Sequence, residues 1–240
     1  QQVVQMISSQ IDADRMDYLL RDSYFTGTKY GNFDLTRILR VMRPYHGGIA
    51  FNFNGMHAVE DYIVSRFQMY QQVYFHPVSR SMEVILSSLL KRAKDLYEMD
   101  QLPHDFAYET LNPFFDNQFS LEQYLKLDDG VLNTCFSIWS ECDDHILKDL
   151  ARRFLNRKPL KSAKVNDDTR SLLPTLRKLI AEAGFDPYYY AATNDSFDLP
   201  YDSYNPNAKK PQTQIELMQT DGSLIELSTV STLVKAISGK

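Results

Sequence analysis

The sequence predicts a mostly helical protein with a small α+β lobe at its C-terminal end. Long segments carry apolar residues at helical spacing and are bounded by capping residues, glycines or prolines. Two short segments, 214–218 and 224–227, flank Thr220-Asp221-Gly222, and an Asp-Gly pair there is typical of a tight β-hairpin. We therefore expect a helical part over residues 1–166 and the α+β lobe over residues 167–240.

The first half of the chain reads as helices around one strand. Asp34 is placed to cap a short helix that stops before Pro44, and the alternation over residues 49–54 predicts a strand. Pro77 fits the first turn of a helix but disfavours helical geometry at His76, which separates two long helices. The helices expected here cover residues 11–27, 35–42, 56–75 and 78–98.

The second half predicts an ordered loop with short helical turns over residues 102–118, and then more helices. Trp139 is expected in the core, and residues 188–193, which begin with three tyrosines, predict a strand. Residues 199–212 predict a long loop or linker. The remaining helices are expected at 121–127, 130–140, 143–156, 169–184 and 231–237.

Composition is typical of a soluble globular protein and excludes several classes. Of 240 residues, 43% are hydrophobic and 24% charged, and the net charge of −5 offers no global basic field for nucleic acid. Cys135 and Cys142, seven apart, match neither a zinc spacing nor a disulfide framework. No apolar run approaches the roughly 20 residues that span a bilayer. We expect a cytoplasmic protein with no membrane contact.

One predicted helix aligns three side chains that suit a binding site. Asp14, Tyr18 and Asp22 follow one another at four-residue spacing, which stacks them on one helix face, and Arg15 and Arg21 flank the row. A carboxylate can hold a hard cation while arginines hold phosphate oxygens. The alternative is a solvated amphipathic helix with ordinary ion pairs.

Two sequence blocks resemble a known enzyme family. Residues 12–22, Asp-Ala-Asp-Arg-Met-Asp-Tyr-Leu-Leu-Arg-Asp, resemble the D-x-D-[KR]-x-D-Y-x-x-R-D signature of HD-domain deoxynucleoside triphosphate triphosphohydrolases, the group of the SAM-and-HD-domain enzyme and dGTPases. A second block, from Arg66 to Tyr74-Phe75-His76, resembles the family's R-x-x-x-x-x-x-x-Y-x-H segment in the same order. The resemblance implies an HD-domain-like helical bundle and a hydrolase.

The chain departs from that family in its metal ligands. The family holds one or two divalent metals with a His, a His-Asp pair and a distant Asp, and here only the last is matched, by Asp14. The sole His-Asp pair, His104-Asp105, follows Asp14 and adjoins Pro103, which favours a loop or a helix start. Because the chain opens Gln-Gln-Val-Val without Met, we expect the C-terminal portion of a longer enzyme, with little or no activity alone.

The resemblance implies roles for individual residues. Asp14 would be the last ligand of a divalent metal, which could be Mg, Mn, Fe, Ni or Zn. Arg15 and Arg66 would hold the triphosphate, and no residue of this chain is expected to act as a catalytic acid or base. Tyr18, Asp22 and Tyr74 would surround the sugar, with Tyr18 excluding a 2′-hydroxyl and Asp22 accepting the 3′-hydroxyl.

The resemblance also implies regulation by an activating nucleotide, GTP or dGTP, bound between subunits. Arg37, His76, Arg157 and Lys161 match the positions that would contact it, although Pro77 replaces a basic residue of the family. A homo-oligomer, either a dimer or a tetramer built from dimers, is the corresponding expectation.

The implied reaction is metal-assisted hydrolysis of a deoxynucleoside triphosphate to deoxynucleoside and tripolyphosphate. Two other classes stay open. One is a different HD phosphohydrolase, acting on nucleoside monophosphates, cyclic dinucleotides or alarmones. The other is a noncatalytic regulatory or scaffold protein that keeps the helical fold.

Overall fold

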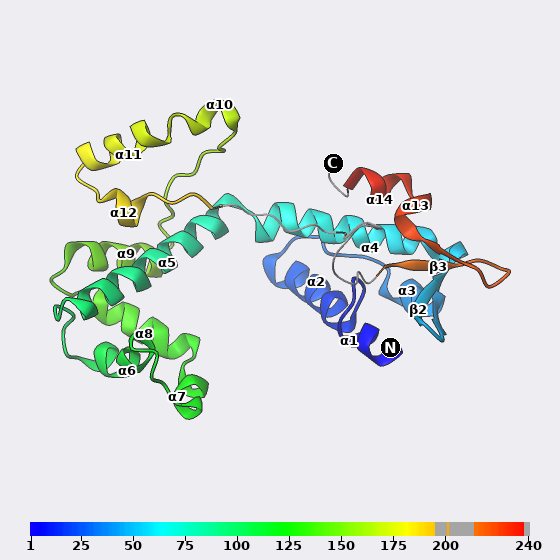
Figure 1. Cartoon of the computed structure of the whole chain (residues 1–240), viewed down its shortest axis with the longest axis horizontal. Helices are drawn as coiled ribbons and strands as arrows, with labels where there is room; N and C mark the ends of the chain where they lie inside the picture. The colour runs from blue at the N-terminus through cyan, green and yellow to red at the C-terminus, as the bar shows by residue number, and fades with distance from the viewer. Residues whose placement is uncertain (195–200, 202–213, 238–240) are drawn as a thin grey trace. The chain divides into compact units, whose positions relative to one another are not determined.

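The computed structural model describes residues 1–194, 201 and 214–237 of the chain. These residues are mostly helical and include a four-stranded sheet (Figure 1). They divide into two compact units, one formed by residues 1–76 with 196–240 and the other by residues 77–195. The first unit is therefore discontinuous in sequence, because the chain leaves it after His76 and returns to it near the C-terminus.

The first unit contains both the candidate site and the sheet. Its elements are α1 (Gln2–Ile7), α2 (Ala13–Thr26), α3 (Leu35–Val41), β1 (Met42–Tyr45), β2 (Gly48–Asn52), a 3-10 turn η1 (Phe53–Gly55), α4 (Met56–Met69), a π-helical turn η2 (Tyr70–Tyr74), β3 (Glu216–Met218), β4 (Leu224–Glu226), α13 (Leu227–Val230) and α14 (Thr232–Ile237).

Helix α2 begins and ends where local chemistry directs it. Asp12 is the N-cap, and its carboxylate accepts a hydrogen bond from the backbone N–H of Arg15 at 2.7 Å. Gly27 ends the helix at φ 71°, the left-handed conformation that glycine adopts without a Cβ clash. Gly31 then lets the following loop pass close to the helix, because a Cβ there would lie 2.4 Å from the carbonyl oxygen of Leu19.

The sheet confirms the predicted strand and hairpin and adds a strand. Its order is β1-β2-β3-β4, with β2 and β3 parallel and the other two pairs antiparallel. Strand β1 was not predicted, because Pro44 was interpreted as a simple helix stop. Pro44 lies on an edge strand, where its missing N–H leaves the pairing with β2 intact. Phe51 of β2 lies opposite Leu217 of β3, which brings the C-terminal hairpin into the first unit.

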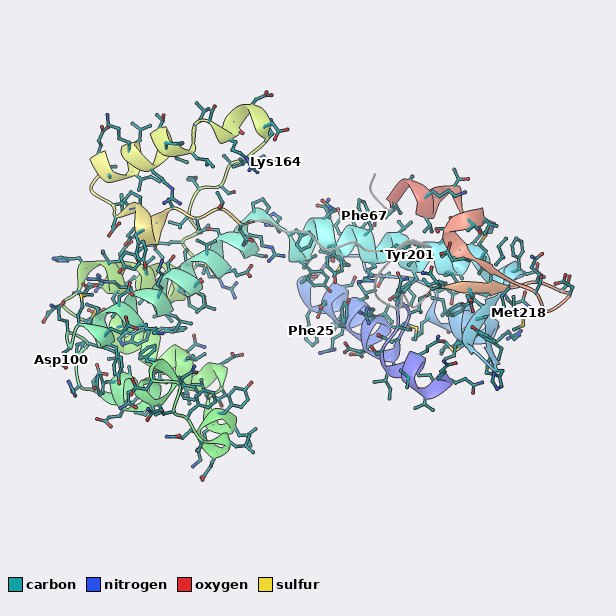
Figure 2. The ribbon with its side chains drawn as sticks, viewed as in Figure 1. Phe25, Phe67, Asp100, Lys164, Tyr201 and Met218 are labelled. Carbon is teal, nitrogen blue, oxygen red and sulfur yellow. The ribbon has the colours of Figure 1, made fainter. Side chains whose placement is uncertain are left out.

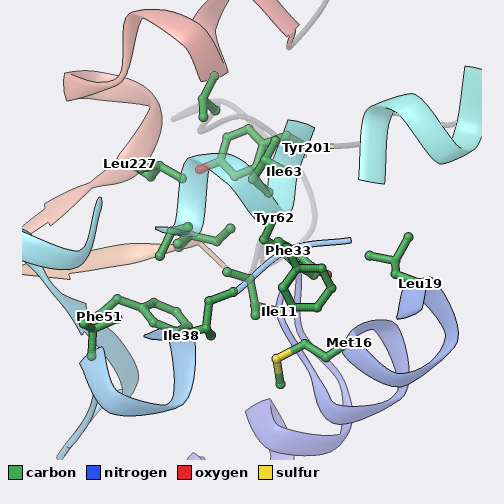
Figure 3. Close-up of a cluster of buried hydrophobic side chains, with 14 of the residues drawn as sticks. Ile11, Met16, Leu19, Phe33, Ile38, Phe51, Tyr62, Ile63, Tyr201 and Leu227 are labelled. Carbon is green, nitrogen blue, oxygen red and sulfur yellow. The ribbon is translucent and has the colours of Figure 1, made fainter. Parts of the chain in front are cut away.

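The core of the first unit lies between α2, α4 and the sheet (Figure 3). Tyr62 of α4 is fully buried, packs edge-to-face on Phe33 with 5.1 Å between ring centroids, and donates a hydrogen bond to the carbonyl of Gln10 at 2.9 Å. Tyr201 is likewise buried in this core, where Figures 2 and 3 label it. Helix α4 is thus held by apolar packing on the face that carries Tyr62.

The second unit is entirely helical in its described residues. Its elements are α5 (Pro77–Glu98), α6 (Phe106–Phe115), α7 (Leu121–Lys126), α8 (Asp129–Trp139), α9 (His145–Leu155), α10 (Asp167–Arg170), α11 (Leu173–Glu182) and α12 (Pro187–Tyr190). Trp139 is fully buried in its core, as predicted. Cys135 and Cys142 are free thiols, and burial raises the pKa of Cys135 to about 11.

The strand predicted for residues 188–193 is wrong. Residues 187–190 form the short helix α12, which Asp186 caps by accepting the backbone N–H of Tyr188 at 2.9 Å. Tyr189 and Tyr190 donate their hydroxyls to Asp95 and Asp149 at 2.5 and 2.8 Å, respectively. These bonds to α5 and α9 anchor a helical turn, and the described part of this unit offers no strand to pair with.

The boundary expected at residue 166 falls inside the second unit, between α9 and α10. Packing contacts define the two units: the C-terminal hairpin pairs with β2 of the first unit, whereas α10 to α12 belong to the second unit. As a division of the chain into family domains, 1–166 and 167–240 stays a prediction. No helix among the described residues has the length and apolarity needed to cross a membrane.

Candidate functional site

The row predicted on α2 is present, and its first residue is more exposed than the other two. Asp14 lies in the first turn and is exposed, whereas Tyr18 and Asp22, one and two turns further on, are half-buried. No hydrogen bond or ion pair joins the Asp14 carboxylate to a described residue. Asp22, in contrast, accepts a hydrogen bond from the hydroxyl of Tyr74 at 2.8 Å. The two ends of the row therefore lie in different environments.

Helix α4 and its π-helical turn face this row. Arg66, in the last turn of α4, is only 6% exposed, and its Nε has no hydrogen-bond partner in the part of the chain that the structure describes. Its guanidinium carbon lies 5.4 Å from the centroid of the Tyr70 ring, within cation–π range. A nearly buried guanidinium with an unused N–H is a feature expected of an anion-binding arginine.

Aromatic contacts join the two helices. The Tyr18 and Tyr74 rings pack edge-to-face with 6.2 Å between centroids, and Tyr74 packs likewise on Tyr70 at 5.1 Å. The bond from Tyr74 to Asp22 reinforces the same junction. The structure thus brings together Tyr18, Asp22, Arg66 and Tyr74, which are up to 56 positions apart in the sequence (74 − 18).

Burial decides the charge of these groups. Burial, and then hydrogen bonding with Tyr70, raises the pKa of Tyr18 to about 12. Burial and the bond to Asp22 raise the pKa of Tyr74 above its ordinary value. Burial lowers the pKa of Arg66, but hydrogen bonding with Tyr70 and the nearby phenols raises it, and the net change is upward. At neutral pH the phenols are therefore protonated and the guanidinium is charged.

Arg15 is held by the helix cap. Its side chain forms an ion pair with Asp12, which is 1% exposed and also accepts the backbone N–H groups of Ser9 and Arg15. A guanidinium has five N–H donors, so this pair leaves others for a ligand. Asp12, which belongs to the family-like signature, therefore acts as a cap and as the anchor of Arg15.

The described residues do not form a metal centre by themselves. No group of three or more His, Cys, Asp or Glu side chains among them could hold a metal ion. The exposed Asp14 carboxylate fits a hard divalent cation in its chemistry, but it supplies only one of the several ligands that such an ion takes. Asp14 therefore remains a predicted ligand that depends on further ligands.

The four residues predicted to contact an activating nucleotide are exposed and distributed over both units. Arg37 lies on α3 and His76 ends the first unit, while Arg157 and Lys161 follow α9 in the second unit. Arg157 has a positive φ of 50°. The described contacts within each unit do not bring these side chains together, so this site stays a prediction.

His104-Asp105 is a helix start, as interpreted from the sequence. Asp105 caps α6 by accepting the backbone N–H groups of Ala107 and Tyr108 at 2.9 and 3.1 Å. His104 stacks on the Tyr108 ring with 4.0 Å between centroids. Local contacts therefore account for this pair.

Sequence reasoning missed Tyr70, which packs on two of the predicted site residues, Arg66 and Tyr74. Tyr70 lies four residues after Arg66 and four before Tyr74, so the same spacing rule that selected Asp14, Tyr18 and Asp22 could have found it. The π-helical turn that begins at Tyr70 has no comparable signal in the sequence. Such turns are frequent at functional sites.

Comparison with known proteins agrees with this architecture. The model of the HD associated region family matches residues 33–170. All of the chain aligns with YwfO, an uncharacterized Bacillus subtilis protein, at 48% identity. A solved phosphohydrolase from Bacteroides thetaiotaomicron superposes with a TM-score of 0.75 and 26% identity over 98% of this chain.

A shorter alignment, over 40% of the chain, is 27% identical to a Dictyostelium discoideum protein named as a deoxynucleoside triphosphate triphosphohydrolase SAMHD1 homolog, of which it covers 19%. The chain spans 55% of YwfO and 60% of the Bacteroides phosphohydrolase, hence little more than half of each. Since the HD associated region matches over half of its residues, this chain belongs to that family.

Proposed function

We propose that this chain carries the nucleotide-binding part of a metal-dependent HD phosphohydrolase that cleaves deoxynucleoside triphosphates to deoxynucleoside and tripolyphosphate. The observation that carries the proposal is the convergence of the buried cation Arg66 with Tyr18, Asp22 and Tyr74. One wall of the site can take a polyanion, and the neighbouring groups can meet a sugar. The partial resemblance to a triphosphohydrolase homolog supports the same substrate class.

Different side chains would contact the triphosphate and the sugar of the substrate. Arg66 and the free donors of Arg15 would hold triphosphate oxygens and stabilise the charge that builds on the leaving tripolyphosphate. The half-buried Tyr18 ring would pack against the sugar where a 2′-hydroxyl would otherwise lie. Asp22 would accept the 3′-hydroxyl, which must compete with the Tyr74 hydroxyl that bonds Asp22 at 2.8 Å.

Asp14 would contribute one carboxylate to a divalent ion. When bound, such an ion polarises the scissile phosphate and lowers the pKa of water, which supplies the nucleophile. Activation by GTP or dGTP through Arg37, His76, Arg157 and Lys161, assembly into a dimer or tetramer, and a cytoplasmic location are further parts of the proposal.

The test is dGTP hydrolysis with added Mn²⁺, comparing this chain with an upstream-extended version. Tripolyphosphate is measured separately from orthophosphate and pyrophosphate, with all four dNTPs and with GTP present. We expect tripolyphosphate from the extended protein and little or none from the chain alone. An Asp22→Asn variant should lose most of the rate, whereas Asp17→Asn, on the exposed side of α2, should keep it.

The products separate the proposal from its alternatives. Orthophosphate from nucleoside monophosphates, or cleavage of a cyclic dinucleotide or alarmone, would replace dNTP hydrolysis with another HD reaction. Absence of any turnover by the extended protein would favour a noncatalytic role.

A further inference from the structure

Tyr70 lies between Arg66 and Tyr74, the two residues of this segment that were predicted to contact the substrate. It is the first residue of the π-helical turn Tyr70–Tyr74, which directly follows the last turn of α4. Arg66 lies four residues before it, and Tyr74 lies four residues after it. A side chain at this point can therefore touch both the cation and the sugar-facing phenol.

The Tyr70 ring is packed on three sides. Arg66 lies over it, with the guanidinium carbon 5.4 Å from the ring centroid. Tyr74 and Phe75 pack edge-to-face on it, at 5.1 and 5.3 Å between centroids and interplanar angles of 74° and 71°. The Tyr74 ring in turn packs on Tyr18 at 6.2 Å. Tyr70 is thus the ring through which Arg66 is connected to the α2 side of the site.

Arg66 depends on this ring for its orientation. Among the described residues, its Nε has no hydrogen-bond partner and no carboxylate forms an ion pair with it. The groups around the guanidinium are the phenols of Tyr62, Tyr18 and Tyr70, and Tyr62 donates its own hydroxyl to a backbone carbonyl. With no described anion to direct it, the planar guanidinium is placed by packing on the Tyr70 ring.

We propose that Tyr70 is a positioning residue that sets Arg66 and, through the packed Tyr74 and Tyr18 rings, ties recognition of the phosphate to recognition of the sugar. The proposal rests on the proposed function for the roles of Arg66 and Tyr18. Tyr70 itself need not touch the substrate. Its loss would leave Arg66 present but misoriented, and it would loosen Tyr18, which discriminates deoxyribose from ribose.

Two substitutions separate the ring from the hydroxyl. Tyr70→Leu removes both, so we expect KM for dGTP to rise about tenfold or more while kcat changes less, since a desolvated cation–π contact has that worth. Tyr70→Phe keeps the ring, so its KM for dGTP should stay close to the wild-type value. It removes the hydroxyl that contributes to the raised pKa of Tyr18, so the preference for dGTP over GTP as substrate should fall about threefold to tenfold. Tyr30→Phe, at an exposed position of the same unit, is the matched control and should change neither quantity.

A double-mutant cycle shows whether Tyr70 acts through Arg66. In an Arg66→Lys background, Tyr70→Leu should raise KM little further, because the planar contact is already lost. If the rise of KM in the double variant equals the product of the rises in the two single variants, the proposal is overturned. So would wild-type KM and wild-type sugar preference in a folded Tyr70→Leu variant, with folding checked by circular dichroism.

Binding of tripolyphosphate to the 240-residue chain, measured by calorimetry, keeps this proposal distinct from the proposed function. If the extended wild-type protein hydrolyses no dNTP, the proposed reaction fails, and the calorimetry alone decides the role of Tyr70. About tenfold weaker binding by Tyr70→Leu would support the positioning role. Equal binding by the variant, or no binding by the wild-type chain, would overturn it.

Discussion

Replacing Arg66 by Met should stabilise the protein while removing its ability to bind polyphosphate. Arg66 is 6% exposed, and no described residue pairs with its Nε or forms an ion pair with its side chain. Removing a cation from water costs several kcal/mol. The contact with Tyr70 offsets about 2 kcal/mol of this. Because Met fills a similar volume without a charge, we expect the free energy of unfolding to rise by about 1–2 kcal/mol.

Urea unfolding followed by circular dichroism measures this change, and hydrogen exchange of peptides from α2 and α4 locates it. The fluorescence of Trp139, the sole tryptophan, follows the second unit in the same titration. Arg40→Met, at an exposed position of α3, is the matched control and should stay within about 0.5 kcal/mol of wild type.

The titration is repeated with tripolyphosphate. A ligand at 100 times its Kd stabilises the native state by about 2.7 kcal/mol. Wild type should show a gain of this kind and Arg66→Met almost none. The reasoning is refuted if Arg66→Met lowers the free energy of unfolding by more than about 1 kcal/mol, or if it gains as much from tripolyphosphate as wild type does.

Three further predictions concern stability. Tyr74→Phe removes the 2.8 Å hydrogen bond to Asp22, so urea unfolding should show a loss of about 1 kcal/mol, and an unchanged midpoint would contradict that bond. Burial raises the pKa of Asp144, but hydrogen bonding from Arg92 lowers it, and the net result is a pKa below the usual range. This stabilisation should be complete above about pH 5 and lost as the pH falls further, and Asp144→Asn should flatten the acid limb of stability against pH. Gly31→Ala would force a Cβ to within 2.4 Å of a backbone oxygen of α2 and should cost about 2 kcal/mol, measured by thermal unfolding; a wild-type Tm would show that the loop yields freely.

Local signals carried most of the helical predictions. Helix α2 was predicted from the four-residue spacing of Asp14, Tyr18 and Asp22 and from the turn at Gly27, and these signals act within a few residues of one another. The hairpin of β3 and β4 was predicted for the same reason, since Asp221-Gly222 specifies a tight turn by its own backbone preferences. The expected mostly helical fold is confirmed because such short-range preferences agree with the packing.

The errors arose where distant contacts decide the outcome. Residues 188–190 have the composition of a strand but form a helical turn, because Asp95 and Asp149 on other helices accept the tyrosine hydroxyls. The C-terminal hairpin pairs with β2, more than 160 residues earlier (216 − 50), which no local pattern indicates. The conformation of residues 188–190 and the pairing partner of the hairpin both depend on residues that are distant in the sequence and become neighbours only in the folded protein.

The site shows the same division. By itself, the sequence determined the face of α2 that presents Asp14, Tyr18 and Asp22, because helical periodicity places residues four apart on one side. Only the tertiary structure decided that Tyr74 bonds Asp22, that Arg66 is buried without a described carboxylate beside it, and that Tyr70 packs on both Arg66 and Tyr74. Burial, pairing and pKa depend on neighbours brought together by packing of α2 against α4, and the spacing of residues along one helix does not contain that information.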